Sequence, residues 1–251
     1  MAATRPLARP PIREAIIEVK SELCEFGKVN RFRDRIASQF PICKPFRMAS
    51  MAYQIPEGTH GADADESSIH QIGWRCESAD GREVALVRTD GFSVARLAGY
   101  PGWEGFVDRF LSLWTEYQSC VAPVEINRVG LRYINDVRLP ITESFDVDQF
   151  LTTAPKTPAG LPQAFVDFLA QMTIPGGTDR TLVNVTQATD SNARTETELP
   201  VIIDIDVCSD RIYPAEPGLA GRVANTLSDM RHIKNRVFFG LITETLAESY
   251  G

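Results

Sequence analysis

Apolar and polar residues alternate in some parts of this chain and recur at helical spacing in others. The segment REAIIEVKSEL, residues 13–23, alternates, which predicts a strand with one buried face. In NRFRDRIASQF, residues 30–40, the apolar residues lie four apart, which predicts a helix capped by Asn30. The apolar face of the predicted strand consists of Ala15, Ile17, Val19 and Leu23.

Two Asp-Gly pairs, at residues 80–81 and 90–91, separate the next apolar runs. Asp-Gly between such runs is typical of tight hairpin turns, so we predict a three-stranded meander. The polar stretch before it, residues 57–68, predicts a loop. A long helix is predicted after the meander, because its apolar residues fall on one face. These residues are Trp103, Phe106, Val107, Phe110, Trp114 and Tyr117.

The second half of the chain repeats this order of patterns. Residues 145–151 predict a short helix or turn, and residues 161–174 fit a helix or a strand. Apolar residues then recur at helical spacing over residues 219–248, which predicts a closing helix of that length. The strands predicted in this half are residues 124–139, 180–189 and 199–207.

Together these patterns predict an α+β fold with a largely antiparallel sheet built from two similar halves. Each half has the order strand, short helix, antiparallel strands and long helix, and both long helices are expected on one face of the sheet. The halves are residues 1–122 and 123–251. The connection between them is short, which favours one compact unit over two domains joined by a linker.

Composition and charge limit the class of protein. The chain has 251 residues, of which 43% are apolar and 24% charged, and its formal net charge is −7. This acidic balance argues against broad binding of nucleic acid, which needs a basic surface. No apolar run reaches the ~18 residues of a membrane span, and the first residues lack a signal-peptide pattern. We therefore expect a cytoplasmic protein without membrane contact.

The five cysteines are odd in number, far apart and without a Cys-x-x-Cys pair. This pattern predicts neither a disulfide framework nor a zinc site. Scattered thiols of this kind are typical of a reducing cytoplasm. The residues are Cys24, Cys43, Cys76, Cys120 and Cys208.

The segment VIIDIDV, residues 201–207, places Asp204 and Asp206 on one face of a strand. Paired carboxylates bind two Mg²⁺ ions in phosphodiester and nucleotide enzymes, which makes both aspartates candidate catalytic residues. Arg128 and Arg132 also share one face of a strand, so ion pairs with the two aspartates explain the same pattern. We favour the ion pairs. In a further interpretation, Arg128 and Arg132 bind an anionic ligand.

No other motif indicates a catalytic or cofactor site. His60, His70 and His232 lack metal-ligand spacing, and no nucleophile elbow, phosphate-binding loop or dinucleotide fingerprint occurs. The basic segment at residues 231–236 is interpreted as the solvated edge of the closing helix, with a basic contact patch as the alternative. We therefore expect no metal and no cofactor.

Several segments of the chain form a recognisable series: PPIREAIIEV, GFSVARL followed after three residues by PGWEGF, NRVGLRYIN, IDIDV and KNRVFFGLIT. In this order they resemble a sporadically distributed family of uncharacterised bacterial proteins. The resemblance extends from about residue 10 to residue 243. It implies no established activity and no catalytic residues, but the patchy occurrence of the family implies mobile genes such as defence or toxin–antitoxin cassettes.

Three functions agree with these observations. The first is a non-catalytic protein-binding or regulatory module that contacts a protein partner or self-associates. The second is a metal-dependent phosphodiester or nucleotide enzyme that uses Asp204 and Asp206. The third is a binder of a small anionic ligand, in which Arg128 and Arg132 face the anion. The absence of a recognisable catalytic motif favours the first.

Overall fold

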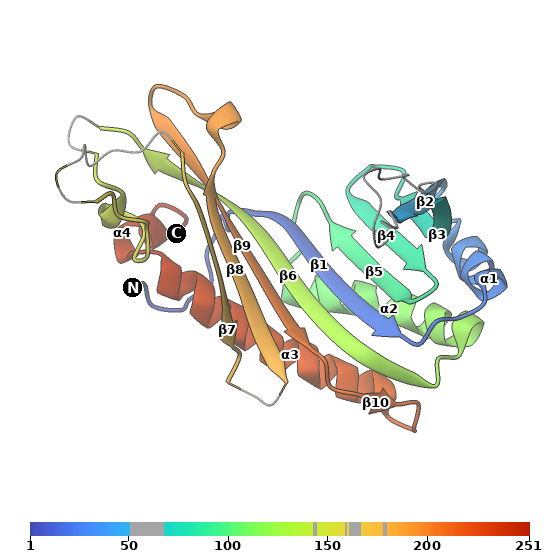
Figure 1. Ribbon diagram of the computed structural model, residues 1–251. Helices are drawn as coiled ribbons and strands as arrows, with labels where there is room; N and C mark the ends of the chain where they lie inside the picture. Colours follow the sequence, from blue (N-terminus) through green and yellow to red (C-terminus); the bar gives the residue numbers. More distant parts are fainter. Residues whose placement is uncertain (51–67, 143–144, 159, 161–166, 178–179) are drawn as a thin grey trace, which may run out of the picture.

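The computed structural model describes residues 1–50, 68–142, 145–158, 160, 167–177 and 180–251 (Figure 1). The elements of the first half are β1 (Ile12–Ser21), α1 (Phe26–Ile36), β2 (Ile42–Ser50), β3 (Ser68–Glu77), β4 (Glu83–Arg88), β5 (Gly91–Arg96) and α2 (Trp103–Val121). Those of the second half are β6 (Glu125–Pro140), η1 (Val147–Gln149), β7 (Leu169–Pro175), β8 (Thr181–Thr189), η2 (Ser191–Ala193), β9 (Glu198–Ser209), β10 (Tyr213–Pro214), α3 (Leu219–Leu241) and α4 (Glu244–Glu248).

All the described strands belong to one antiparallel sheet, and β1 pairs with β6 at its centre. The strand order is β2-β3-β4-β5-β1-β6-β9-β8-β7, and the short β10 also pairs with β6. Each half therefore extends outward from its own first strand. In Figure 1, α2 lies behind the first half of the sheet and α3 runs behind β6 and β9. This arrangement confirms the predicted α+β class with two similar halves and the long helices on one face.

The alternating pattern of β1 produces the buried face that the sequence predicts. Ala15, Ile17 and Val19 have no exposed surface. Burying a side chain of the size of Ile17 or Val19 stabilises the fold by about 1.5–3 kcal/mol. Leu23 was predicted on the same face and is exposed, because β1 ends at Ser21 and the alternation stops there.

An aromatic cluster joins α1 and α2 to the sheet. The Phe92 ring of β5 lies 5.3 Å from the Phe32 ring of α1 and 5.5 Å from the Phe110 ring of α2, measured between centroids. Tyr117 packs on the same ring, and its hydroxyl forms a 2.9 Å hydrogen bond with the Ser21 hydroxyl. The apolar stripe of α2 is therefore core, as its helical spacing predicts.

Both predicted Asp-Gly turns are present, one between β3 and β4 and one between β4 and β5. Gly91 has a φ of +137°, and a Cβ at this residue would lie 2.1 Å from the carbonyl oxygen of Val19. β1 and β5 thus approach too closely here for any side chain. Gly91 is therefore needed both for the tight turn between β4 and β5 and for the close packing of β5 against β1.

The predicted helix start at Asn30 is wrong. α1 begins at Phe26, so Asn30 lies inside the helix, where its Oδ1 accepts a 2.9 Å hydrogen bond from Trp74 Nε1 of β3. The segment that fitted a helix or a strand forms β7, while residues 161–166 lie outside the described part of the chain. The polar stretch at residues 57–67 and His60 also lie outside it.

The closing helix is shorter than predicted. α3 ends at Leu241, Ile242 is extended, and the side chain of Thr243 caps the separate helix α4 by accepting a hydrogen bond from the Leu246 N–H. Within the described residues, no helix is long and apolar enough to cross a lipid bilayer.

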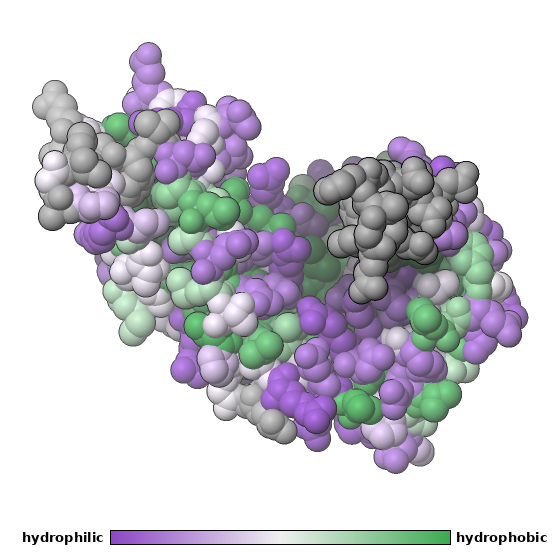
Figure 2. Space-filling model, viewed as in Figure 1, coloured by the Kyte–Doolittle hydropathy of each residue, from purple (hydrophilic) through white to green (hydrophobic). Residues whose placement is uncertain are grey.

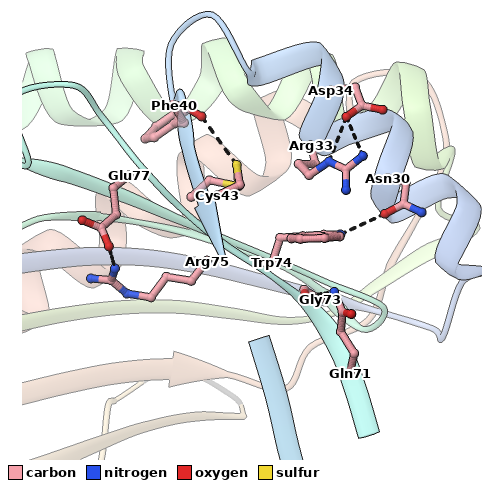
Figure 3. Close-up of a disulfide and its surroundings, with 11 residues drawn as sticks. Asn30, Arg33, Asp34, Phe40, Cys43, Gln71, Gly73, Trp74, Arg75 and Glu77 are labelled. Carbon is pink, nitrogen blue, oxygen red and sulfur yellow. Dashed lines mark hydrogen bonds and ion pairs between the residues drawn. A yellow bond between two sulfur atoms is a disulfide. The ribbon is translucent and has the colours of Figure 1, made fainter. Parts of the chain in front are cut away.

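A disulfide joins Cys43 and Cys76, contrary to the expectation that the cysteines stay unpaired (Figure 3). The two residues lie opposite each other on β2 and β3, with their Cα atoms 4.0 Å apart. Spacing along the sequence could not show this, because the pair depends on the register of two strands 33 residues apart. Beside the disulfide, the Arg33 guanidinium lies 4.4 Å from the centroid of the Trp74 ring and links α1 to β3.

Candidate functional site

A row of charged side chains, which we name the charge ladder, crosses the open face of the sheet, the face shown in Figure 2. It consists of Glu18, Arg88, Arg128, Arg132, Asp204, Asp206 and Asp210. Arg132 of β6 stands opposite Asp206 of β9 in the strand register, yet its guanidinium binds the neighbouring Asp204. The pair is bidentate, with 2.9 Å from Nε to Oδ1 and 2.5 Å from Nη2 to Oδ2. This geometry is the strongest that an arginine and a carboxylate form.

Arg128 continues the charge ladder between three carboxylates. Its guanidinium lies 3.5 Å from Glu18 of β1 and 3.7 Å from Asp206. Asp210, just beyond β9, is also 3.7 Å away. Arg88 of β4 extends the charge ladder by donating a 2.7 Å hydrogen bond to Glu18. The predicted proximity of Asp204 and Asp206 to Arg128 and Arg132 is therefore confirmed.

Each aspartate of the charge ladder already faces a cation. The hydrogen bond to Asp204 is the main cause that raises the Arg132 pKa. Burial raises the pKa of Asp206, although the charge of Arg128 opposes this effect. Carboxylate oxygens held by guanidinium groups are less available to Mg²⁺, which favours a structural role over a catalytic one. The catalytic role of the two aspartates stays a hypothesis.

Metal-binding clusters are absent from the part of the chain that the structure describes: no three residues among His, Cys, Asp and Glu are placed to hold an ion. His70 on β3 and His232 on α3 are both exposed. Neither histidine belongs to the charge ladder.

A cavity of about 690 Å³ opens on the opposite side of the sheet, between the start of α2, the middle of α3 and the N-terminal segment. We name it the α2–α3 cavity. Tyr133 and Asn135 line its sheet side. Among the described residues, its lining includes the three cations Arg5, Arg231 and Lys234 and no Asp or Glu. Arg5 is paired with Glu244 and Arg231 with Glu104, two acids outside the lining, so Lys234 is the cation of this lining that forms no ion pair within the described structure.

Lys234 occupies a position in the apolar stripe of α3. It follows Met230 by four residues and precedes Phe238 by four, and both of these are buried. Its Nζ lies 4.0 Å from the centroid of the Tyr133 ring, and in the described structure no carboxylate forms an ion pair with it. Burial, followed by the charge of Arg231, lowers the pKa of Lys234 to about 8.

Two further positive groups border the α2–α3 cavity. The Arg231 guanidinium lies 5.3 Å from the centroid of the Trp103 ring and 3.4 Å from Glu104, whose side chain is largely exposed. α2 begins at Trp103, and Gly102 before it provides no side-chain cap. The first turn of a helix presents unpaired N–H groups and the positive end of the helix dipole, which both attract anions.

Aromatic rings form much of the remaining lining. The hydroxyls of Tyr100 and Tyr133 lie 2.7 Å apart, and the rings of Phe238 and Phe239 lie 5.4 Å apart between centroids. Burial raises the pKa of both tyrosines, so both hydroxyls remain protonated at neutral pH. A flat apolar group can pack among these rings while an acidic group contacts the cations.

The sequence interpretation missed the α2–α3 cavity. It assigned residues 231–236 to a solvated helix edge, which is correct for the exposed Arg236 and wrong for Lys234. The available signal was the helical periodicity itself, since Lys234 falls in the apolar stripe. The contact between Tyr100 and Tyr133 brings together the two halves, and no local spacing predicts such a contact.

No model of a known protein family matches this chain. A search of the curated proteins finds no match either. The resemblance to the sporadically distributed bacterial family therefore stays a prediction, and the function is inferred from the charge ladder and the α2–α3 cavity.

Proposed function

We propose that the chain is a non-catalytic binding protein that holds a small organic anion with a flat apolar body in the α2–α3 cavity. The observation that supports this most is Lys234, which lines a cavity without Asp or Glu in its described lining and forms no ion pair within the described structure. Burying a cation without a partner costs free energy, and an anion entering the cavity offsets that cost. The sequence interpretation placed an anion at Arg128 and Arg132. The proposal places it in the α2–α3 cavity instead, because Asp206 and Asp204 already balance the charges of these two arginines.

The size and position of the cavity support a regulatory role. A volume of about 690 Å³ lies within the range of small-molecule sites. α2 belongs to the first half of the chain and α3 to the second, so a ligand in the cavity would contact both. Because the cavity exists only when the two halves are packed together, binding would stabilise the folded chain relative to the unfolded chain.

The test compares an acid and a base of similar shape, phenylacetate and phenethylamine, in thermal unfolding. Phenylacetate should raise the Tm and phenethylamine should not, because only the acid complements the cationic lining. Lys234→Met should remove the shift, whereas Arg236→Met, on an exposed face of the same helix, should retain it. Equal shifts with both compounds, or an unaltered response of Lys234→Met, would contradict the proposal.

Self-association through β7 is the second candidate function. Among the described strands β7 pairs only with β8, and its exposed apolar residues include Leu169, which is 66% exposed, and Met172. It has no charged residue, whereas the opposite edge strand, β2, contains Lys44, Pro45 and Arg47, which discourage strand addition. An uncharged apolar edge fits antiparallel pairing with β7 of a second copy.

Sedimentation velocity over a range of protein concentrations tests the β7 contact. The native chain should shift toward dimer as concentration rises, and Met172→Lys should remain monomeric at the same concentrations. A native chain that stays monomeric throughout would argue against self-association through this edge.

The remaining expectations stay predictions. A metal-dependent activity would require millimolar Mg²⁺ to raise the Tm, with loss of the rise in Asp204→Asn; we expect no rise. The disulfide between Cys43 and Cys76 removes one argument for a cytoplasmic location, because disulfides are rare in reducing compartments. The defence or toxin–antitoxin context rests on the family resemblance alone.

A further inference from the structure

The amine of Lys234 lies in surroundings unlike those of other lysines in the chain. Lys28 donates a 2.8 Å hydrogen bond to the Val121 carbonyl, and Lys20 lies 3.4 Å from Asp90. Lys234 instead faces the Tyr133 ring inside the α2–α3 cavity, without a carboxylate partner among the described residues. Its nitrogen is thus close to an open space and not tied to an acid.

The charged and titratable groups around Lys234 come from every element that borders the cavity. They favour the neutral amine, because the two nearby acidic groups, Glu104 and Glu244, are exposed and paired with Arg231 and Arg5, which leaves Lys234 without a carboxylate partner among the described residues. A pKa of about 8 leaves about half of the amines neutral at pH 8, against roughly 0.3% for a lysine at 10.5. The groups are Arg231 and His232 of α3, Arg5 of the N-terminal segment, Tyr100 and Glu104 around the start of α2, Tyr133 of β6, and Glu244 of α4.

Arg231 and Lys234 are placed to engage two adjacent functional groups of one ligand. They are three residues apart on α3, so their side chains lie on the same helix face, one turn apart. A carboxylate held by Arg231 and the first turn of α2 would bring its neighbouring carbon toward the Lys234 nitrogen. If that carbon is a carbonyl, the amine can attack it.

We propose that Lys234 forms a reversible imine with the carbonyl carbon of an α-oxo acid whose carboxylate lies against Arg231 and the first turn of α2. This inference rests on the proposed function and specifies the ligand class of the same cavity. The α-oxo acid is the simplest organic anion with a carbonyl directly beside its carboxylate.

The chemical step is balanced without any co-reactant. The neutral amine of Lys234 adds to the carbonyl carbon and gives a carbinolamine. Loss of the carbinolamine hydroxyl together with the remaining nitrogen-bound hydrogen releases one water and leaves a C=N bond. No electrons are transferred, and the paired hydroxyls of Tyr100 and Tyr133 provide proton donors within the cavity. Hydrolysis reverses the step and frees the ligand.

Reductive trapping tests the imine. The full chain is incubated with phenylpyruvate and then with sodium borohydride, which reduces C=N to a stable secondary amine, and the adduct is located by peptide mass mapping. Adduct should form on Lys234 at least roughly tenfold above the exposed Lys156, given the larger neutral fraction at Lys234. Lys234→Met should lose it. Lys234→Arg, which keeps the charge, should still bind phenylacetate and give no adduct.

The outcomes separate this inference from the proposed function. Binding of phenylacetate without trapping of phenylpyruvate above the Lys156 level would overturn the imine and leave the anion site in place. Neither binding nor trapping would overturn both. Trapping that persists in Lys234→Met would also overturn the imine, because the adduct would then lie elsewhere.

Discussion

Lys234 and Arg132 show two opposite ways in which this chain places a cation. Arg132 stands on the open face, donates hydrogen bonds to both carboxylate oxygens of Asp204, and keeps 45% of its side chain exposed. Lys234 replaces an apolar residue in the stripe of α3 and has an aromatic ring as its neighbour. The first arrangement satisfies a charge within the protein, whereas the second leaves a charge for a ligand to satisfy.

Lys234→Met should stabilise the unliganded chain at neutral pH. The folded pKa of about 8 lies below the unfolded value of 10.5, so the unfolded chain holds the proton more tightly. The cost of burying the charge is therefore fully present below pH 8 and disappears as the pH rises toward 10.5. We expect the variant to gain about 2 kcal/mol at pH 7.

Urea unfolding at pH 7 and at pH 10 checks this. The difference in unfolding free energy between Lys234→Met and the native chain should be large at pH 7 and small at pH 10. The comparison of two proteins cancels the titration of tyrosines and thiols in the same range. A variant that is less stable at pH 7 would show that Lys234 has a partner in solution.

Arg132→Ala should cost only about 0.5–1 kcal/mol of unfolding free energy. The loss is small because the Arg132 side chain is nearly half exposed, so water can hydrate the Asp204 carboxylate once the guanidinium is removed. The same measurement in 1 M salt should reduce the loss further. A loss of about 3 kcal/mol or more would instead indicate a pair shielded from water.

Among the elements, those with a strong local pattern were predictable. The alternation of β1, the stripe of α2 and the Asp-Gly turns each depend on residues close in the sequence. The cap of α1 was placed at Asn30, five residues after the observed cap Glu25, because Asn30 is a residue type common at caps, whereas its side chain contacts Trp74. The Cys43–Cys76 pair depends on how β2 meets β3, and the spacing of the two cysteines along the sequence does not set that register.

Cys43→Ser should destabilise the chain by about 3 kcal/mol under oxidising conditions, since a cross-link over 33 residues restricts the unfolded state. Reductant should lower the stability of the native chain to that of the variant. Cys120→Ser removes a free thiol and is the matched control, with little expected change. Denaturant unfolding with and without dithiothreitol gives the stability of the native chain and of both variants. A native chain indifferent to reductant would contradict the expectation.

For the whole molecule, the sequence predicted the α+β class and the part of the charge ladder formed by Arg128, Arg132, Asp204 and Asp206, but neither its extension to Glu18 and Arg88 nor the α2–α3 cavity. The charge ladder follows from strand geometry, because residues two or four apart share a face once β6 and β9 are neighbours. The cavity requires α2, α3 and the N-terminal segment to meet. Tyr100 and Lys234 are 134 positions apart in the numbering, and only the assembled fold brings them to one space.

Residues 1–122 alone should not fold cooperatively. β1 is paired on both sides, with β5 from its own half and β6 from the other, and the buried face of β6 includes Leu131 and Tyr133. Removing β6 would leave β1 as an unprotected edge above an open core. Circular dichroism during heating should show no sharp transition for this fragment and a single one for the full chain. A cooperative transition of the fragment would show that the first half folds as an independent domain.

β6 separates two chemically different sides of the molecule. Tyr133 faces the α2–α3 cavity, and Arg132, joined to it by one peptide bond, faces the open sheet and holds Asp204. An occupant of the cavity that shifted the β6 backbone at Tyr133 would move Arg132 as well, because the two residues share a peptide bond. Such a ligand would change the arrangement of charged side chains on the opposite face of the sheet. A partner bound to that face would then respond to a ligand that it does not contact.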